Sequence, residues 1–246
     1  MENLIPLLGI AKKAALKSGD YLKENFSLNN EASFDDGRDI KLKIDVESED
    51  LILRMLRENS NIPILSEESG ANENLGKTYW VVDPLDGSSN YFRKIRICAV
   101  SIALIHEGKP ILGVINDFMN DDLYYGSKNE GAFCNDVQIK VSSTNATNKG
   151  TIMSGIPAKQ VYSNEEFTSM IELFQEWKKV RMIGSAAVAN LYVADGRADC
   201  YEEKDTFIWD VAAGAIIVEE AGGLANLSEI RDDFRVNAKF TNGKII

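Results

Sequence analysis

Two aspartates three positions apart, Asp83 and Asp86, follow an apolar segment and carry the strongest chemical signal in this sequence. They belong to the run Trp80-Val81-Val82-Asp83-Pro84-Leu85-Asp86-Gly87-Ser88-Ser89-Asn90. Two carboxylates, the backbone carbonyl between them and a nearby hydroxyl are hard oxygen ligands of the kind that Mg²⁺ takes. The same residue types also form ordinary polar turns after buried strands, which is the alternative interpretation of this run taken alone.

A proline and a glycine shape the backbone of this run. Pro84 has a fixed φ and no N–H group, so we expect the strand to turn there. Gly87 lets the backbone come close to whatever occupies the turn.

Three further carboxylates, Asp45, Glu67 and Asp210, stand where strands are expected to end or helices to begin. Loops at such ends, held by a rigid scaffold, are where sites are usually built. Each also has a purely structural explanation: a helix cap for Asp210, a favourable first-turn charge for Asp45 and a solvated loop charge for Glu67.

The spacing of apolar residues predicts the elements that position these carboxylates. Helical spacing and cap residues predict helices over 3–26, 45–58, 165–178, 184–193 and 211–221. Ser163 and Asn164 are cap signals at the start of one helix, and Gly222 with Gly223 marks the end of another. Strands are predicted at 62–65, 79–82, 97–105, 110–118, 123–126, 131–134, 151–156, 198–202, 224–226 and 235–238, and a polar loop at 35–39.

This alternation of helices and strands predicts an α/β (α+β) layered protein with mixed sheets. A Ser/Thr/Asn-rich link near 145–150 suggests two lobes. We expect residues 1–145 to form an N-terminal lobe with the large sheet and most of the site carboxylates. Residues 146–246 would then form a C-terminal α/β lobe that completes the site.

Composition narrows the partners and the compartment. The 246 residues, 44% of them hydrophobic, suffice for a sizeable core, and no apolar run reaches the length of a membrane span. A net charge of −11 argues against nucleic acid or a membrane surface as the main partner. The N-terminus lacks signal-peptide features, and three dispersed cysteines, Cys98, Cys134 and Cys200, suggest reduced thiols, so we expect a cytoplasmic protein.

The single histidine, His106, falls in an apparent hairpin turn, where we expect it to be a surface residue. A mechanism through a phosphohistidine therefore has no candidate in this chain.

Several pieces in the right order and spacing link the chain to a known family. They are Asp45, Ser66-Glu67-Glu68-Ser69-Gly70, the run 80–90, Gly184-Ser185-Ala186-Ala187, Trp209-Asp210-Val211-Ala212-Ala213-Gly214 and Glu220-Ala221-Gly222-Gly223. With these pieces the chain resembles the inositol monophosphatase family, within the superfamily that also holds fructose-1,6-bisphosphatases and bisphosphate nucleotidases. The resemblance covers nearly the whole chain.

The resemblance implies an αβαβα sandwich of the sugar-phosphatase type and a phosphomonoesterase that depends on two or three Mg²⁺ ions. It implies that Glu67, Asp83 and the carbonyl of Leu85 bind one metal, and that Asp83, Asp86 and Asp210 bind a second. Asp45 would contribute through water to a weaker third metal and so count among the catalytic residues.

The same resemblance implies the roles around the reacting phosphate. Glu67 and Ser88 would orient the attacking water and take up its proton. Two divalent ions can stabilise both the attacking and the leaving oxygen of an in-line displacement. The substrate would be a small phosphate ester bound by Gly87, Ser88, Gly184, Ser185, Ala186 and Glu203. Ser88 stands where most members carry a threonine, and the hydroxyl is kept.

The identity of the ester is open at this level. An inositol-type polyol or a sugar phosphate fits best, with fructose-1,6-bisphosphatase, 3'(2'),5'-bisphosphate nucleotidase and histidinol phosphatase activities as alternatives. Ser89 and Asn90 replace the Lys-Glu pair usual in bacterial bisphosphate nucleotidases, which weakens the nucleotidase alternative.

Two further expectations concern the whole protein. A non-catalytic regulatory protein with this fold is the alternative from another class, and the complete carboxylate set favours an enzyme over it. The resemblance also implies a homodimer, sensitivity to lithium, and a helix after residues 240–246, where this sequence stops.

Overall fold

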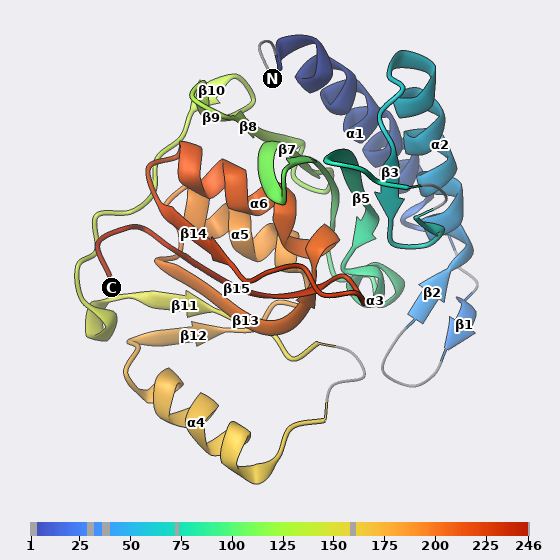
Figure 1. Ribbon diagram of the computed structural model, residues 1–246. Coiled ribbons are helices and arrows are strands. Elements are labelled where there is room, and N and C mark those ends of the chain that lie inside the picture. The colour runs from blue at the N-terminus through green and yellow to red at the C-terminus, as the bar shows by residue number, and fades with distance from the viewer. Residues whose placement is uncertain (1–3, 29–31, 36–39, 72–73, 158–160, 246) are drawn as a thin grey trace.

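The computed structural model describes residues 4–28, 32–35, 40–71, 74–157 and 161–245 (Figure 1). Its elements stack in five layers. Helices α1 and α2 cover one face of a large sheet, α5 and α6 lie between this sheet and a smaller one, and α4 lies outside the smaller sheet. This is the predicted α+β sandwich with mixed sheets. The helices are α1 (Ile5–Asn25), α2 (Lys43–Asn59), α3 (Ser88–Phe92), α4 (Asn164–Gln175), α5 (Ala186–Ala194) and α6 (Ile208–Glu220), with a short 3₁₀ turn at Thr147–Lys149.

The large sheet has eight strands in the order β10-β9-β8-β7-β6-β5-β3-β4. All its neighbours are antiparallel except β3 and β5, which run parallel. Its strands are β3 (Ile64–Ser66), β4 (Gly70–Ala71), β5 (Thr78–Asp86), β6 (Ala99–His106), β7 (Lys109–Asp117), β8 (Asp122–Ser127), β9 (Gly131–Cys134) and β10 (Val137–Gln138).

The smaller sheet has five strands in the order β12-β11-β13-β15-β14. Its β11 pairs in parallel with both β12 and β13, and the remaining pairs are antiparallel. Its strands are β11 (Thr151–Met153), β12 (Lys179–Arg181), β13 (Cys200–Phe207), β14 (Leu224–Leu227) and β15 (Arg235–Thr241). A separate pair is formed by β1 (Ala32–Asp35) and β2 (Ile40–Leu42).

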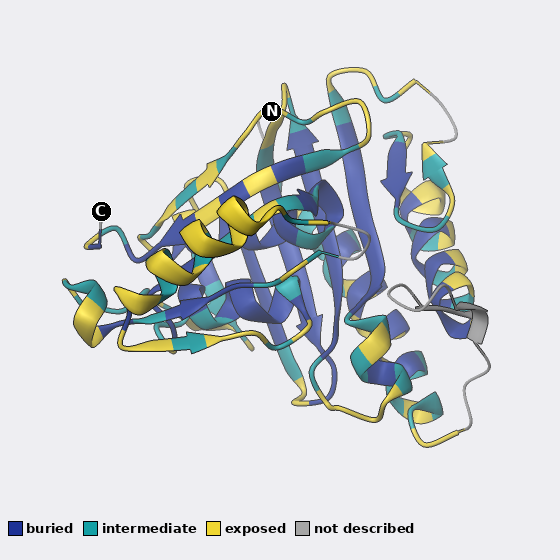
Figure 2. Cartoon of the chain, turned by 90° about the horizontal axis from the view of Figure 1, so that it is seen from below, coloured by how far each residue is buried: buried dark blue, intermediate teal, exposed yellow. Residues whose placement is uncertain are grey.

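Helix α6 is the central packing element because it contacts both sheets. It is apolar all round, with ten buried residues, as a helix between two sheets must be. Gly113 on β7 makes the close approach possible, since a Cβ atom there would lie 2.5 Å from the carbonyl oxygen of Ala213. The two sheets share one continuous apolar cluster through this helix, and Figure 2 shows the buried strands in dark blue beneath more exposed helices.

Most predicted elements are confirmed, including the cap that Ser163 provides at the start of α4, where it also forms a capping box with Glu166. The expected turn at Pro84 is wrong. Strand β5 continues to Asp86, because a bulge opposite β6 places three steps of β5 (Asp83 to Asp86) against two steps of β6. A proline is tolerated at a bulge, where its missing N–H removes no ladder hydrogen bond.

Other differences concern short elements and the ends of longer ones. The short elements β1, β2, β4, β10, β12 and α3 were not predicted. Strand β11 ends at Met153 rather than at residue 156, and α4 ends at Gln175 rather than near 178. Of the loop expected at 35–39, residues 36–39 lie outside the described residues. Within the described part of the chain, no helix combines the length and apolar character needed to cross a membrane.

Candidate metal centre and active-site cleft

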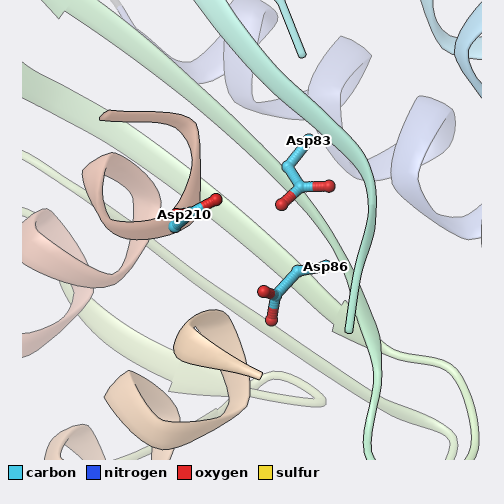
Figure 3. Close-up of side chains that lie close together, drawn as sticks. All are labelled: Asp83, Asp86 and Asp210. Carbon is cyan, nitrogen blue, oxygen red and sulfur yellow. The ribbon is translucent and has the colours of Figure 1, made fainter. Parts of the chain in front are cut away.

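Three carboxylates from two distant parts of the chain meet between the large sheet and α6 (Figure 3). Asp83 and Asp86 come from the end of β5, and Asp210 comes from the first turn of α6. One oxygen from each of the three lies within 4.8 Å of the others. We refer to Asp83, Asp86 and Asp210 as the carboxylate cluster.

The beginning of α5 holds Asp86 in place. Its carboxylate accepts hydrogen bonds from the Ser185 hydroxyl and from the backbone N–H groups of Ala186 (3.2 Å) and Ala187 (2.9 Å). Ser185 is the N-cap of α5, and its oxygen also accepts from the N–H of Val188 (3.2 Å). A carboxylate at a helix N-terminus is favoured by the unpaired N–H groups and by the helix dipole.

Asp210 and Asp83 are each held by hydrogen bonds from groups that lie close to them in the chain. Asp210 accepts from the Thr206 hydroxyl (2.8 Å) and from the N–H of Phe207 (3.0 Å), so it caps α6 as well as facing the cluster. The N–H of Leu85 donates to Asp83 (3.0 Å) within the bulge. Each carboxylate is therefore fixed before any ligand is bound.

Glu67 and Asp45 lie beside the cluster. Strand β3 pairs with β5, and the N–H of Glu67 donates to the carbonyl of Val82 (3.1 Å), which brings Glu67 next to Asp83. The two carboxyl groups share a hydrogen bond. Asp45 is buried in the first turn of α2, and its charge adds to the rise in the pKa of Glu67.

Burial raises the pKa of Glu67, Asp83, Asp86 and Asp210, and repulsion from neighbouring carboxylates adds to the rise at Glu67, Asp83 and Asp86. Burial is the largest cause at each of the four groups. The pKa values of Glu67 and Asp83 lie well above their ordinary range, that of Asp86 rises to about 7, and that of Asp210 rises to about 6. Crowded, buried carboxylate oxygens are a donor set that suits Mg²⁺, whose charge would offset this repulsion.

A cleft of about 280 Å³ opens against the cluster. The six residues expected to bind substrate all lie in its wall: Gly87, Ser88, Gly184, Ser185, Ala186 and Glu203. Asp86 and Asp210 line the same cleft, so a phosphate ester bound there would reach the cluster. Sequence reasoning missed Ser154, Gly155 and Tyr201, which also line the cleft. Ser154 and Gly155 directly follow the end of β11, and Tyr201 lies near the start of β13.

Gly87 and Asn90 allow two segments, the one after β5 and the one before α5, to pack closely at the mouth of the cleft. Gly87 has φ +82°, and a Cβ atom there would lie 2.8 Å from the carbonyl oxygen of Ile97, so only glycine fits. The Asn90 side-chain amide donates to the carbonyls of Ile97 (2.8 Å) and Ile183 (2.7 Å). The start of α5 is thereby tied to the motif that carries Asp86.

Glu203 forms the far wall of the cleft. Burial and the charge of Asp210 raise its pKa to about 8, and its Oε2 accepts a hydrogen bond from the Tyr201 hydroxyl (3.0 Å).

The lone histidine lies at the opposite end of the sheet. His106 ends β6 opposite Thr78, eight residues along β5 from Asp86, which corresponds to about 25 Å of strand. Its Nδ1 lies 2.7 Å from the Thr78 hydroxyl. It therefore stays outside the site, as expected.

Comparison with known proteins places these features in context. A model of the inositol monophosphatase family matches residues 3–229. The chain is 35% identical over 224 residues to a Pasteurella multocida protein named Nus factor SuhB, which covers 89% of this chain and 84% of that protein. It is 33% identical over 231 residues to the fructose-1,6-bisphosphatase/inositol-1-monophosphatase of Aquifex aeolicus, covering 92% and 88% of the two chains. The structure of inositol monophosphatase from Anabaena (Nostoc) sp. PCC 7120 superposes with a TM-score of 0.83 at 33% identity, covering 98% and 92%.

Proposed function

Since the chain belongs to the inositol monophosphatase family, we propose that it is a Mg²⁺-dependent phosphomonoesterase that acts on a small phosphorylated polyol or sugar. The observation that carries the proposal is the carboxylate cluster, two of whose members, Asp86 and Asp210, line a cleft large enough for such an ester. A purely structural site would not need several buried negative charges beside a cavity, because burying such charges without a partner costs free energy.

Five carboxylates and one carbonyl would hold two or three Mg²⁺ ions. The cluster, Glu67 and the backbone carbonyl of Leu85 would bind two ions, and Asp45 would contribute through water to a third. When bound, the ions would supply charge to stabilise the phosphate and to activate the attacking water.

The chain's own groups would position and move the reacting atoms. Glu67, with Ser88, would orient the water and accept its proton. The N-terminus of α5 keeps Asp86 aimed at the cluster through three hydrogen bonds, so this carboxylate needs no reorganisation when substrate binds. Glu203, on the far wall, would accept a hydrogen bond from a hydroxyl of the alcohol half.

A phosphate-release assay tests this function. Purified protein with Mg²⁺ is expected to release phosphate from at least one of inositol 1-phosphate, fructose 1,6-bisphosphate, a 3',5'-bisphosphate nucleotide and histidinol phosphate. Chelation of Mg²⁺ should abolish the release, and lithium, titrated against Mg²⁺, should inhibit it. If none of the four esters is hydrolysed in Mg²⁺, the enzymatic proposal fails.

A regulatory role is the second candidate, and the name of the Pasteurella multocida relative favours it. The arrangement of the site supports catalysis instead, because all three members of the cluster are present and two of them, Asp86 and Asp210, line the open cleft. The same assay separates the two candidates, since a purely regulatory protein would bind partners without any Mg²⁺-dependent release of phosphate.

A further inference from the structure

The buried face of α2 carries three polar side chains beside the candidate metal centre. Asp45, Ser48 and Glu49 are spaced i, i+3 and i+4, so they lie on one face of the helix, and each is at most 4% exposed. Helix α2 packs on β5 and lies beside β3, the two strands that lead to Asp83 and to Glu67 (Figure 1). Of the three side chains, Asp45 alone has a place in the proposed metal centre.

Glu49 is bonded to the turn that carries Glu67. Its Oε1 accepts a hydrogen bond from the backbone N–H of Ser69 (3.1 Å). Ser69 is the last residue of the turn 67–69 between β3 and β4, and Glu67 is the first. At the other end of the turn, the N–H of Glu67 donates to the carbonyl of Val82 on β5 (3.1 Å). The turn is therefore held at one end by the large sheet and at the other end by α2.

The end of the turn that Glu49 holds leads into a very short strand. Strand β4 consists of Gly70 and Ala71, pairs with β3 alone and forms the edge of the large sheet. Ser69 itself is exposed, and a Cβ atom at Gly70 would meet open space. A segment with so few packing contacts has little local stability of its own. We therefore expect the bond to Glu49 to supply much of the restraint on this end of the turn.

A carboxylate is an expensive side chain to place at this buried position. Burying a charge costs free energy, and an apolar side chain could fill the same space without that cost. What the carboxylate adds is an acceptor at the point where the turn presents a backbone N–H, and hydrogen bonds to an ionised acceptor are stronger than neutral ones. Glu49 therefore serves the turn more than it serves the packing of α2.

The placement of the turn matters because Glu67 must meet the carboxylate cluster. The carboxyl groups of Glu67 and Asp83 share a hydrogen bond, so a small shift of the turn would separate them. Mg²⁺ demands a near-ideal arrangement of its oxygen ligands. A turn free to move at Ser69 would spread the positions of the Glu67 carboxylate, and fewer molecules would hold the ligand oxygens in that arrangement.

We propose that Glu49 is a positioning residue of the metal centre: it holds the turn 67–69 against α2 and thereby keeps the Glu67 carboxylate directed at the carboxylate cluster. The inference rests on the proposed function, specifically on Glu67 as a ligand of Mg²⁺. Glu49 acts through the backbone of Ser69, so the reach of its acceptor oxygen decides its effect and its charge is secondary.

Two conservative variants separate reach from charge. Glu49→Asp keeps the charge but withdraws the carboxylate from the Ser69 N–H by one C–C bond, about 1.5 Å. Glu49→Gln removes the charge but keeps a carbonyl oxygen at the same reach. The same two changes at Glu58, an exposed glutamate of α2, are the matched controls.

Calorimetric titration with Mg²⁺ measures the affinity of each variant without depending on turnover. We expect Glu49→Asp to weaken Mg²⁺ binding and to lower kcat, each by about tenfold or more, as removal of an outer partner of a metal site usually does. The KM for the ester at saturating Mg²⁺ should stay close to that of the wild type, because the wall of the cleft is unchanged. Glu49→Gln and both Glu58 variants should keep Mg²⁺ affinities close to that of the wild type.

The outcomes separate the inference from the proposed function. A wild-type Mg²⁺ affinity in Glu49→Asp, even with a lowered Tm, would make Glu49 purely structural and overturn the inference. A loss in Glu49→Gln that equals or exceeds the loss in Glu49→Asp would make the charge decisive and overturn it too, as would an equal loss in Glu58→Asp. A wild-type protein that binds Mg²⁺ but hydrolyses none of the four esters overturns the proposed function, while the Mg²⁺ affinities still decide the role of Glu49. A wild-type protein that binds no Mg²⁺ overturns both.

Discussion

Asp86 serves two elements at once, which makes it the most sensitive residue of the cluster. It ends β5, and its carboxylate accepts from the first turn of α5. An asparagine at this position would place its NH₂ group close to the N–H groups of Ala186 and Ala187, so that hydrogen-bond donors would face donors. It would also remove one negative charge from the cluster. The residue therefore contributes both to ligand binding and to the placement of the cleft wall.

The variant Asp86→Asn is expected to lower kcat/KM by at least about 100-fold, because even the outer partners of a metal site cost 10–100-fold when they are removed. Circular dichroism should show an unchanged fold. The control Asp50→Asn changes an exposed carboxylate of α2 and should keep wild-type activity. Wild-type turnover in Asp86→Asn would remove Asp86 from the centre.

Asn90 is a positioning residue, and its removal is expected to cost both stability and activity. Asn90→Ala leaves the partly buried carbonyls of Ile97 and Ile183 without their donor, at about 0.5–1.5 kcal/mol for each hydrogen bond lost. The start of α5 would shift, so we expect kcat/KM to fall about tenfold or more. Thermal unfolding and steady-state kinetics measure the two effects, with exposed Asn164→Ala as control. Full activity together with a lowered Tm would show that Asn90 is structural only.

Among the elements, the bulge in β5 decides how the cluster is presented. The Ser48 hydroxyl on α2 donates to the carbonyl of Pro84 (2.9 Å), and Ser18 on α1 lies 2.6 Å from Ser48. Both serines are fully buried. The two outer helices thus hold the bulge from the face of the sheet opposite to α6.

Ser48→Ala is expected to lower the free energy of unfolding by about 1–3 kcal/mol, because the carbonyl of Pro84 loses a buried donor. For a chain of this size each kcal/mol corresponds to roughly 2–4 °C in Tm. The affinity for Mg²⁺, measured by calorimetry, should fall with it. Ser18→Ala, which leaves the bond to Pro84 in place, should retain more of the Mg²⁺ affinity. Equal Mg²⁺ affinities in the two variants would contradict a role of Ser48 at the bulge.

At the scale of the whole molecule, the carboxylates couple the stability of the fold to pH. The pKa values of Asp86 and Asp210 rise from an ordinary 3.8 to about 7 and about 6 in the fold. The folded state therefore binds protons more tightly than the unfolded state. This contribution is fully present below about pH 4 and is lost as the pH rises through 6 and 7.

We expect the Tm of metal-free protein, measured in a chelator, to fall between pH 5 and pH 8 by an amount that corresponds to about 1–4 kcal/mol. Mg²⁺ should raise the Tm more at pH 8 than at pH 5, because protons compete with the metal for the same oxygens. Scanning calorimetry at both pH values, with and without Mg²⁺, measures the difference. A Tm that is independent of pH in the chelator would contradict the crowding of charges described above.

The layered arrangement can be compared with the predicted division of the chain into two lobes. The strands of the large sheet end by Gln138, and those of the smaller sheet begin at Thr151. One apolar cluster nevertheless runs through α5 and α6 and joins both sheets. The boundary near 145 stays a prediction about how the chain is organised.

The sequence alone determined what depends on neighbours along the chain. Apolar stripes and caps such as Ser163 locate the helices, and the spacing of Asp83 and Asp86 predicts two carboxylates at a strand end, because each of these signals is local. Only the tertiary structure decided what depends on partners far apart: the bulge that carries β5 past Pro84, the hydrogen bond of Asn90 to the segment before α5, and the close packing of Gly155 against Glu203. The physical reason is that a contact between distant segments is set by the packing of whole elements, which no local pattern records.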